Sequence, residues 1–326
     1  MLENANKAYV IAYGSVLKSN VPNWSETSHK HPEADTLLIC LINELSQFVP
    51  ELSILWVSPD TDVLMLTLHY ISTQSQSASD IDIVFQLLTS KGRRSFPINI
   101  IINYFGADIC SSLLGLYVFT GCDQIGRFKS ITKERTFKAF LNTVNSGNSE
   151  ITDCLKFMGE EIVIPVEHQK SLERLTVLFF ISKKKELTER YASCGDIGVL
   201  RWKLQSKFSE ENDLLPPTPA ALKFHIMRAN FVTFLWKRLM RCLSPVLPNM
   251  IGNGWNDDLT PVMTDEQPAP EFSLELTVCG CKKTHCSNKR CSCFKFELKC
   301  TDACHCLDCQ NELTSFEEIG FDSAWC

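Results

Sequence analysis

The sequence predicts an α/β domain with a largely parallel sheet, followed by a helical region and a small cysteine-rich metal module. Three observations lead to this architecture. Strand-like and helix-like segments alternate in the first half, helical patterns dominate from about residue 136 to 243, and cysteines crowd into the last 48 of the 326 residues. Alternation of strands and helices is typical of parallel sheets, because each parallel connection has to cross over, usually through a helix.

The alternating elements follow one another closely. Apolar runs predict strands over Ala8–Gly14 and Leu52–Val57, and apolar residues at helical spacing predict helices over Glu33–Phe48 and Asp60–Ile71. A hairpin, an apolar helix and a mainly helical stretch come next: Asp82–Leu88 with Phe96–Tyr104 joined at Lys91–Arg94, then Cys110–Thr120, then Thr136–Leu243. Thr218-Pro219 marks a helix start, because threonine caps helices and proline fits their first turn.

The amino-acid composition limits the kinds of partner that the chain can bind. The chain is 44% hydrophobic and 21% charged, which is ordinary for a globular protein. Its net charge of −6 argues against a wholly basic surface for nucleic acid, so any DNA contact has to come from local patches. No stretch approaches the ~20 apolar residues that span a bilayer. The start lacks a basic segment followed by an apolar one, so we expect neither membrane insertion nor secretion.

Cysteine usage divides the chain. Of the sixteen cysteines, six are scattered and are expected to be small buried hydrophobes in a reducing compartment: Cys40, Cys110, Cys122, Cys154, Cys194 and Cys242. Nine others follow the pattern C-x-C-x4-C-x4-C-x-C-x6-C-x3-C-x-C-x2-C, and we take them as metal ligands: Cys279, Cys281, Cys286, Cys291, Cys293, Cys300, Cys304, Cys306 and Cys309.

The ligand count fits a three-zinc cluster. Zinc takes four thiolates in a tetrahedron, so three separate sites would need about twelve sulfurs. Nine suffice if three sulfurs each bridge two metals. Three Zn²⁺ and nine thiolates carry a charge of −3, which matches the excess of basic over acidic residues in the module: Lys282, Lys283, Lys289, Arg290, Lys295 and Lys299 against Glu297, Asp302 and Asp308. Soft thiolate ligands favour zinc over calcium or magnesium.

The alternative is a module stapled by disulfides. The odd number of ligand cysteines, the C-x-C pairs that cannot easily bridge each other, and the lack of an export signal count against it. His285 and His305 lie between ligands, and either could replace a cysteine, although we expect both to be bystanders.

The segment CGCKKTHCSNKRCSCFKFELKCTDACHCLDCQN resembles the CXC domain of tesmin/TSO1-type proteins in all nine cysteines and in the closing Asn311. This resemblance covers about a tenth of the chain. It implies three zinc ions and DNA binding, with a side chain inserted into the minor groove. Where tesmin-type proteins have a tyrosine before the fourth cysteine, this chain has Arg290. Arginine reads the narrow minor groove of A·T-rich DNA, so we expect Arg290 to do so here.

The lysines beside Arg290 are expected to support this contact. Lys282, Lys283 and Lys289 would meet phosphates. Tesmin-type proteins carry two CXC copies and this chain has one, which predicts weaker affinity and weaker sequence choice. The plainer alternative is that these lysines only neutralise the metal cluster.

Five acidic residues form a second candidate site. Glu33 and Asp35 open one predicted helix, Asp60 and Asp62 open another, and Asp123 follows the apolar helix. Ligand sites of parallel sheets lie at the carboxyl ends of strands, so these carboxylates could converge and hold Mg²⁺ or Mn²⁺. Two such ions can activate water and stabilise the leaving oxygen of a phosphodiester. The alternative is an ordinary helix start, since acids in a first turn favour the helix dipole.

The motifs EADT, SPDTDVLML and GLYVFTGCDQIGRFKSITKERTFKAFL are similar to the core of flap-endonuclease-like PIN-domain nucleases over residues 8–145. The resemblance implies a helix–two-turn–helix that grips duplex backbone. It also implies a set of metal carboxylates: Glu33, Asp35, Asp60, Asp62 and Asp123. With the later LPPTPAALKFHIMRANF and the CXC ending, the chain also resembles uncharacterised transposon-derived animal proteins.

Two departures from the PIN-domain pattern bear on activity. The family's first acids come from an N-terminal strand and helix, yet no aspartate precedes Asp35, and the only glutamates before Glu33 are Glu3 and Glu26. The chain is therefore expected to be a fragment or to begin partway through the domain. Ser130 and Thr132 stand in a turn that is normally glycine-rich, so that backbone amides can approach phosphate. We expect a retained fold with impaired or absent catalysis.

The sequence thus predicts five parts: a PIN-like domain over 1–145, a helical extension over 146–243, a linker with prolines and glycines over 244–275, a CXC module over 276–312 and a tail over 313–326. We expect a nuclear, DNA-binding zinc protein with a degenerate nuclease-like domain. Two alternatives stay open: an active Mg²⁺- or Mn²⁺-dependent, structure-specific DNA nuclease of transposon origin, and a protein–protein adaptor.

Overall fold

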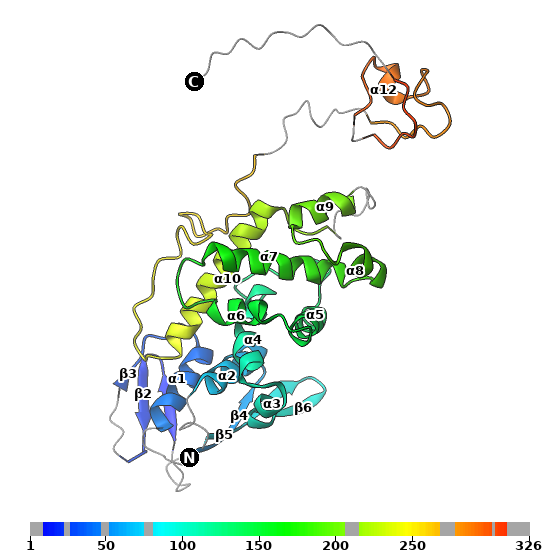
Figure 1. Cartoon of the computed structure of the whole chain (residues 1–326). Coiled ribbons are helices and arrows are strands. Elements are labelled where there is room, and N and C mark those ends of the chain that lie inside the picture. Colours follow the sequence, from blue (N-terminus) through cyan, green and yellow to red (C-terminus); the bar gives the residue numbers. More distant parts are fainter. Residues whose placement is uncertain are drawn as a thin grey trace. The chain divides into compact units, whose positions relative to one another are not determined.

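The computed structural model describes residues 9–22, 27–46, 52–74, 81–205, 215–267, 278–301 and 304–311. The chain divides into two compact units, Met1–Asp265 and Glu266–Cys326. The larger unit combines helices and strands, and the smaller unit is the cysteine-rich part of the chain (Figure 1). The end of the predicted linker, 268–275, and the predicted tail, 313–326, lie outside the described residues.

Two small sheets lie in the first unit, each with its strands in chain order: β1 (Val10–Tyr13), β2 (Val16–Ser19) and β3 (Thr27–Ser28) in one, and β4 (Leu52–Ser58), β5 (Ile81–Thr89) and β6 (Gly92–Pro97) in the other. The prediction of a largely parallel sheet is wrong: among the strands that the structure describes, only β4 and β5 pair in parallel. The connections explain this, because β4 and β5 are joined through a helix, whereas two residues join β5 to β6 and permit only a hairpin.

Two predicted strands differ in detail. The run Ala8–Gly14 was expected to be a buried strand, but β1 belongs to an antiparallel sheet and three of its four residues are exposed. The hairpin at Lys91–Arg94 is confirmed, but its second strand ends at Pro97 and residues Ile98–Phe105 form α3. Short apolar runs fit a strand and a buried helix equally well, so periodicity alone does not separate them.

The long helical patterns are confirmed. They form α1 (Ala34–Ser46), α2 (Thr61–Thr73) and α4 (Ala107–Phe119), followed by α5 (Lys133–Asn145), α6 (Ser149–Phe157), α7 (Val166–Ile181), α8 (Lys185–Tyr191), α9 (Ile197–Gln205) and α10 (Pro219–Leu239). The predicted start at Thr218-Pro219 is also correct, since the Thr218 side chain accepts a hydrogen bond of 3.2 Å from the amide of Ala221.

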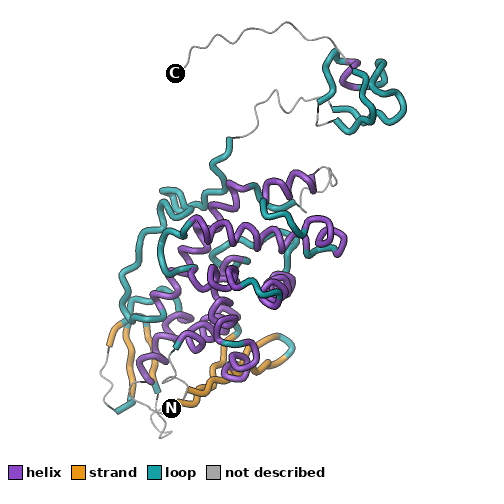
Figure 2. The backbone as a smooth tube through the Cα atoms, in the orientation of Figure 1, coloured by secondary structure: helices purple, strands orange, loops and turns teal. Residues whose placement is uncertain are grey.

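Helix α4 runs through the core of the first unit and packs against α2, α6 and α10 (Figure 2). Gly115 allows the close approach of α6, because a side-chain carbon there would lie 2.3 Å from the carbonyl oxygen of Leu155. Before α4 the chain bends by 105° at Gly106, whose φ is +87°. Among the described helices, none is by itself long and apolar enough to cross a membrane, and only the bent pair α3 and α4 together has that length and composition.

Much of the segment predicted as a linker packs on α10 instead. Trp255 is buried and its ring meets the ring of Phe231, with 5.6 Å between the centroids. Arg228, on the same helix, is also buried and donates hydrogen bonds to the carbonyl oxygens of Gly254 and Val262. These contacts satisfy a buried guanidinium, and the first unit extends to residue 265 as a result.

Candidate metal centre

Sulfur atoms occupy the interior of the cysteine-rich module. Cys279, Cys286, Cys291 and Cys293 are buried, and partly buried cysteines and Phe294 pack against them. The described backbone winds around this interior with a single short helix, α12 (Ser292–Lys295). Hydrogen bonds from the later loop close the chain on itself, since the amides of His305 and Leu307 donate to the carbonyl oxygens of Cys279 and Cys281 at 2.8 and 3.0 Å. An interior made of thiols needs a metal to hold it together.

The distances between sulfurs fit metal coordination. The Cys279–Cys286 and Cys279–Cys300 pairs lie 3.6 Å apart, Cys291–Cys300 3.9 Å and Cys293–Cys304 3.5 Å. A disulfide would place two sulfurs about 2.05 Å apart. Four sulfurs about 2.3 Å from a tetrahedral zinc are about 3.8 Å from one another. The cysteine cluster therefore fits zinc, and the described cysteines are free thiols rather than disulfides.

The sulfurs fall into three overlapping groups of four, each with its sulfurs within 4.8 Å of one another: Cys279, Cys291, Cys293 and Cys300; Cys279, Cys286, Cys300 and Cys306; and Cys279, Cys281, Cys286 and Cys291. Cys279 belongs to all three groups, and Cys286, Cys291 and Cys300 each belong to two. Overlap of this kind is what a cluster with bridging thiolates requires.

The remaining predicted ligands lie beside these groups. Cys304 contacts Cys293, and Cys309 interacts with Cys300 and Cys306. Neither His285 nor His305 belongs to any of the groups in the described part of the chain. The structure thus brings the nine cysteines together and leaves both imidazoles out.

Hydrogen-bond donors contact two of the ligand sulfurs and oppose the effect of burial, which on balance raises the pKa of Cys300. Asn311 is buried, and its side-chain amide donates to the carbonyl oxygen of Leu298 at 2.8 Å and to the sulfur of Cys300 at 3.3 Å. Burial opposes ionisation of Cys291, but hydrogen bonds from the amide of Phe294 and from neighbouring thiols lower its pKa overall. Both donors favour sulfur as a negatively charged ligand.

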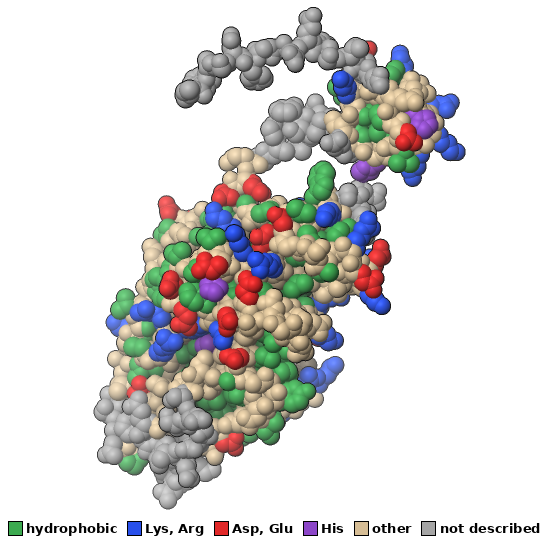
Figure 3. All heavy atoms as spheres, in the orientation of Figure 1, with side chains coloured by type: hydrophobic (Ala, Val, Ile, Leu, Met, Phe, Trp, Pro, Cys, Tyr) green, Lys and Arg blue, Asp and Glu red, His purple; other side chains and the backbone are tan. Residues whose placement is uncertain are grey.

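Basic side chains stand on the surface of the module (Figure 3). Lys282, Lys283 and Arg290 line one hollow of about 480 Å³, together with Gly280, Thr284, Ser292 and two ligand cysteines. Lys289, which sequence reasoning grouped with them, is exposed but does not line the hollow. The structure therefore gathers three of the four predicted DNA contacts around one depression.

Comparison with known proteins identifies this module. Residues 276–313 match the tesmin/TSO1-like CXC domain, a cysteine-rich domain. The chain carries a CXC domain at its C-terminus. A stretch of 82 residues is 32% identical to the protein tesmin/TSO1-like CXC 8 of Arabidopsis thaliana. The match covers 23% of this chain and 22% of that protein. The chain thus matches only about a fifth of this relative's length. No solved structure matches the chain, and nothing in these comparisons supports the PIN-like resemblance of the first half.

Outside the CXC domain, the structure gathers the five predicted carboxylates near the start of α2. Asp60 caps this helix, with its Oδ1 accepting a hydrogen bond of 2.9 Å from the amide of Asp62. Asp62 is 8% exposed and accepts a hydrogen bond from the Tyr117 hydroxyl. Glu33 and Asp123 are exposed, and Gln124 beside Asp123 donates to Glu33 at 3.3 Å.

Burial and the neighbouring carboxylates both act on Asp35. Burial, and then the negative charges of Asp60, Asp62, Glu33 and Asp123, raise the pKa of Asp35 to about 6. Burial also raises the pKa of Asp62, against the hydrogen bond from Tyr117. Their oxygens remain too far apart for a ligand shell, because no carboxylate belongs to any set of three or more ligand side chains within 4.8 Å in the described residues. The five acids are electrostatic neighbours without a closed metal site.

A lysine that sequence reasoning missed lies within this cluster. Although much of Lys133 is exposed, its ammonium lies 3.4 Å from the centre of the Tyr117 ring and donates to the carbonyl oxygens of Tyr117, at 2.7 Å, and Gly121. Burial of the ammonium lowers the pKa of Lys133 to about 8, against the attraction of Cys122 and Asp62. Lys133 begins α5, and nothing in its spacing from the acids marks it as their neighbour.

The turn before α5 keeps a conformation that normally requires glycine. Ser130 has φ of +60°, in the left-handed region, and its hydroxyl accepts a hydrogen bond of 2.7 Å from Lys183. Thr132 caps α5 by accepting from the amide of Arg135. The two residues that depart from the PIN-domain pattern therefore shape the turn through their side chains.

The raised pKa of Asp35 predicts a pH-dependent cost to stability. With a folded-state pKa of about 6 against about 3.9 unfolded, the folded protein holds the proton between these values, so stability falls as pH rises from about 4 to about 6 and stays lower above. We expect Asp35→Asn to raise the unfolding free energy by about 1 kcal/mol at pH 8, after allowance for solvent screening, and by almost nothing at pH 4. Urea unfolding measures both values.

The control for this experiment is Asp82→Asn, at an exposed position on β5. It should leave stability unchanged at both pH values. An Asp35→Asn variant that is less stable than the parent at pH 8 would show that the carboxylates do not repel one another.

Proposed function

We propose that this protein binds duplex DNA through a CXC domain that holds three zinc ions on nine cysteines. The overlapping groups of sulfurs carry this proposal: they contain seven of the nine cysteines and share sulfurs, and sharing is what would let nine thiolates complete three tetrahedra. Zinc supplies the cross-links of a module whose interior is built from cysteine, and the folded module then presents its basic side chains in fixed positions.

The basic hollow supports DNA as the partner. Lys282, Lys283 and Arg290 converge on one depression of a chain whose net charge is −6, so the positive potential is local. Arg290 is exposed beside the buried ligand Cys291 and is our candidate for the minor groove of A·T-rich DNA. The lysines are our candidates for phosphate contacts. The resemblance to CXC domains favours DNA over a protein partner, and we place the protein in the nucleus on that basis.

The zinc content tests the cluster. Elemental analysis of the purified full chain should give three zinc ions per chain. Cys286→Ser should release more than one of them, because Cys286 is fully buried and belongs to two groups. Cys242→Ser, at an exposed cysteine outside the module, should leave the zinc content at three. A parent protein with about one zinc, or with its module cysteines paired in disulfides, would contradict the cluster.

DNA affinity tests the basic hollow. We expect Arg290→Gln to weaken binding to an A·T-rich duplex about tenfold, or about 1.4 kcal/mol, and binding to a G·C-rich duplex less. Lys283→Gln should weaken both equally and reduce the slope of log affinity against log salt by about 1. Fluorescence anisotropy across a salt series measures these values.

Lys295→Gln is the matched control for the DNA experiment, because Lys295 lies over the Phe296 ring and does not line the hollow. Lys295→Gln should weaken DNA binding less than Arg290→Gln or Lys283→Gln does. Binding that neither depends on salt nor responds to Arg290→Gln would favour the adaptor hypothesis instead.

A second candidate function is metal-dependent DNA cleavage by the first unit. The observation that favours it is the clustering of five acids, whose charges add to the effect of burial and raise the pKa of Asp35 to about 6. A divalent ion would relieve this repulsion and draw the oxygens together. The Lys133 ammonium beside Asp62 and the distances between the oxygens support impaired catalysis, so binding remains our first proposal.

Cleavage of flap or nicked DNA with Mn²⁺ tests the second candidate. Asp60→Asn is the informative variant, because asparagine caps a helix as well as aspartate does but removes the charge. Activity in the parent and its loss in Asp60→Asn, with unfolding unchanged, would support an enzyme. A parent without cleavage over the whole range of Mn²⁺ and Mg²⁺ concentrations would remove this candidate.

A further inference from the structure

A second pocket in the first unit lies away from the carboxylates. It is a cavity of about 280 Å³ between α1, the end of α2 and the end of α10, lined by Asn43, His69, Tyr70, Thr73, Gln74, Lys237, Met240 and Arg241. Asp60 caps the 13-residue helix α2, Asp62 lies in its first turn and Gln74 follows its last residue, so the two sites are about 20 Å apart along the helix. No carboxylate lines this pocket.

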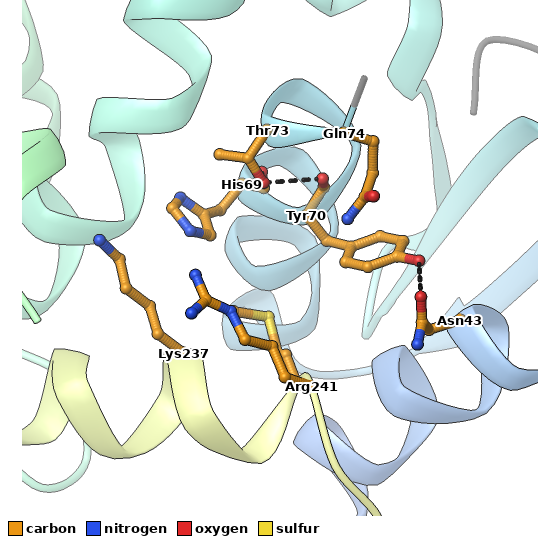
Figure 4. Close-up of a pocket in the computed structure, with 8 residues that line it drawn as sticks. Asn43, His69, Tyr70, Thr73, Gln74, Lys237 and Arg241 are labelled. Atoms are coloured by element: carbon orange, nitrogen blue, oxygen red, sulfur yellow. Dashed lines mark hydrogen bonds between the residues drawn. The ribbon is translucent and has the colours of Figure 1, made fainter. Parts of the chain in front are cut away.

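Three basic side chains converge in the pocket (Figure 4). Lys237 on α10 and Arg241 in the turn after α10 extend toward His69 on α2. Lys237 is 3% exposed, and its ammonium donates to the carbonyl oxygen of Lys156 at 2.7 Å and to the carboxylate of Glu160 at 2.6 Å. These bonds use two of its three N–H groups. The third N–H can serve a ligand in the pocket.

Arg241 has more capacity for a ligand than Lys237. It is exposed, and no ion pair to it exists within the residues that the structure describes. A guanidinium presents several N–H donors in a planar fork that matches an oxyanion in a bidentate manner. The side-chain amide of Asn43 accepts the Tyr70 hydroxyl through its oxygen at 3.1 Å, which leaves its NH₂ group for a ligand (Figure 4).

The charges around this pocket affect the pKa of His69. It is 6% exposed, and its Nδ1 lies 2.9 Å from the carbonyl oxygen of Ser111, which can only accept, so Nδ1 carries the proton in the neutral ring. Burial, and then the positive charges of Lys237 and Arg241, lower the pKa of His69 to about 4, against the hydrogen bond to Ser111 and the negative charge of Glu160. Glu160 pairs with Lys237, so Arg241 is the cation of the pocket that a bound anion would compensate.

We propose that this pocket binds a phosphate group. The lining offers the Arg241 guanidinium, the Lys237 ammonium that Glu160 also contacts, and neutral amide donors but no carboxylate, and donors of this kind bind a phosphate oxyanion. The cavity is just below the ~300–1,000 Å³ of typical small-molecule sites, so it accommodates a phosphate with a small substituent. The phosphate belongs either to a small phosphomonoester or to the backbone of nucleic acid that reaches the pocket from the surface.

Binding of inorganic phosphate to the full zinc-loaded chain tests the proposal. Phosphate should bind saturably by isothermal titration calorimetry and raise the melting temperature, whereas chloride at equal ionic strength should not. Arg241→Gln should weaken phosphate binding at least tenfold, and Arg241→Lys should lose less. Arg238→Gln is the matched control, because Arg238 is exposed near the end of α10, lies over the Phe234 ring and does not line the pocket.

Two further probes separate the sources of the phosphate. Loss of ribose 5-phosphate binding in Arg241→Gln, with unchanged affinity for a duplex oligonucleotide, would support a small-molecule site. An equal loss for the oligonucleotide would support a contact with nucleic-acid backbone.

The alternative explanation is that Lys237 and Arg241 only compensate the carbonyl groups at the ends of α2 and α10. In that case phosphate adds nothing beyond chloride, or Arg241→Gln binds it as tightly as the parent. Either result overturns the proposal. Neither result bears on the CXC domain, whose zinc content and DNA affinity are measured separately.

Discussion

The fold of the CXC domain depends on one constraint: cysteine sulfurs fill its interior, where other domains have apolar side chains. Its buried hydrophobic residues are cysteines, and its described backbone has only one short helix, so its interior is built around sulfur rather than around apolar side chains. Because Cys279, Cys286, Cys291 and Cys300 each belong to more than one group, loss of a single sulfur disturbs several groups at once. This interdependence fixes the loops between the ligands, and with them the hollow where Lys282, Lys283 and Arg290 meet.

In the first unit, burial and like charges act together at two sites and shift the pKa values there in opposite directions. Near the start of α2, acids crowd together and the pKa of Asp35 rises to about 6. Near the end of the same helix, cations crowd together and the pKa of His69 falls to about 4. At both sites, like charges lower the stability of the folded protein, and a bound ligand of opposite charge would raise it again. Proteins also contain clusters of like charge that hold no ligand, so binding experiments decide whether either site is a ligand site.

The sequence predicted some elements well for physical reasons that act locally. The helices at Ala34–Ser46, Thr61–Thr73 and Pro219–Leu239 follow from apolar spacing and capping residues that lie within a few positions of one another. It failed at Ile98–Phe105, where an apolar run forms a helix, and at the pairing of the sheets. Strand pairing depends on contacts between distant segments, which periodicity does not encode.

The same division holds for the sites. By itself, the sequence determined the CXC domain and predicted its zinc ligands, because nine cysteines at fixed spacing within 31 residues have few ways to satisfy zinc. The tertiary structure alone decided which sulfurs are shared, that Lys133 lies beside Asp62, and that His69 meets Lys237 and Arg241 across 168 to 172 residues of chain. Those neighbours are brought together by helix packing, and the energy of a charge depends on what surrounds it in space rather than on what precedes it in the chain.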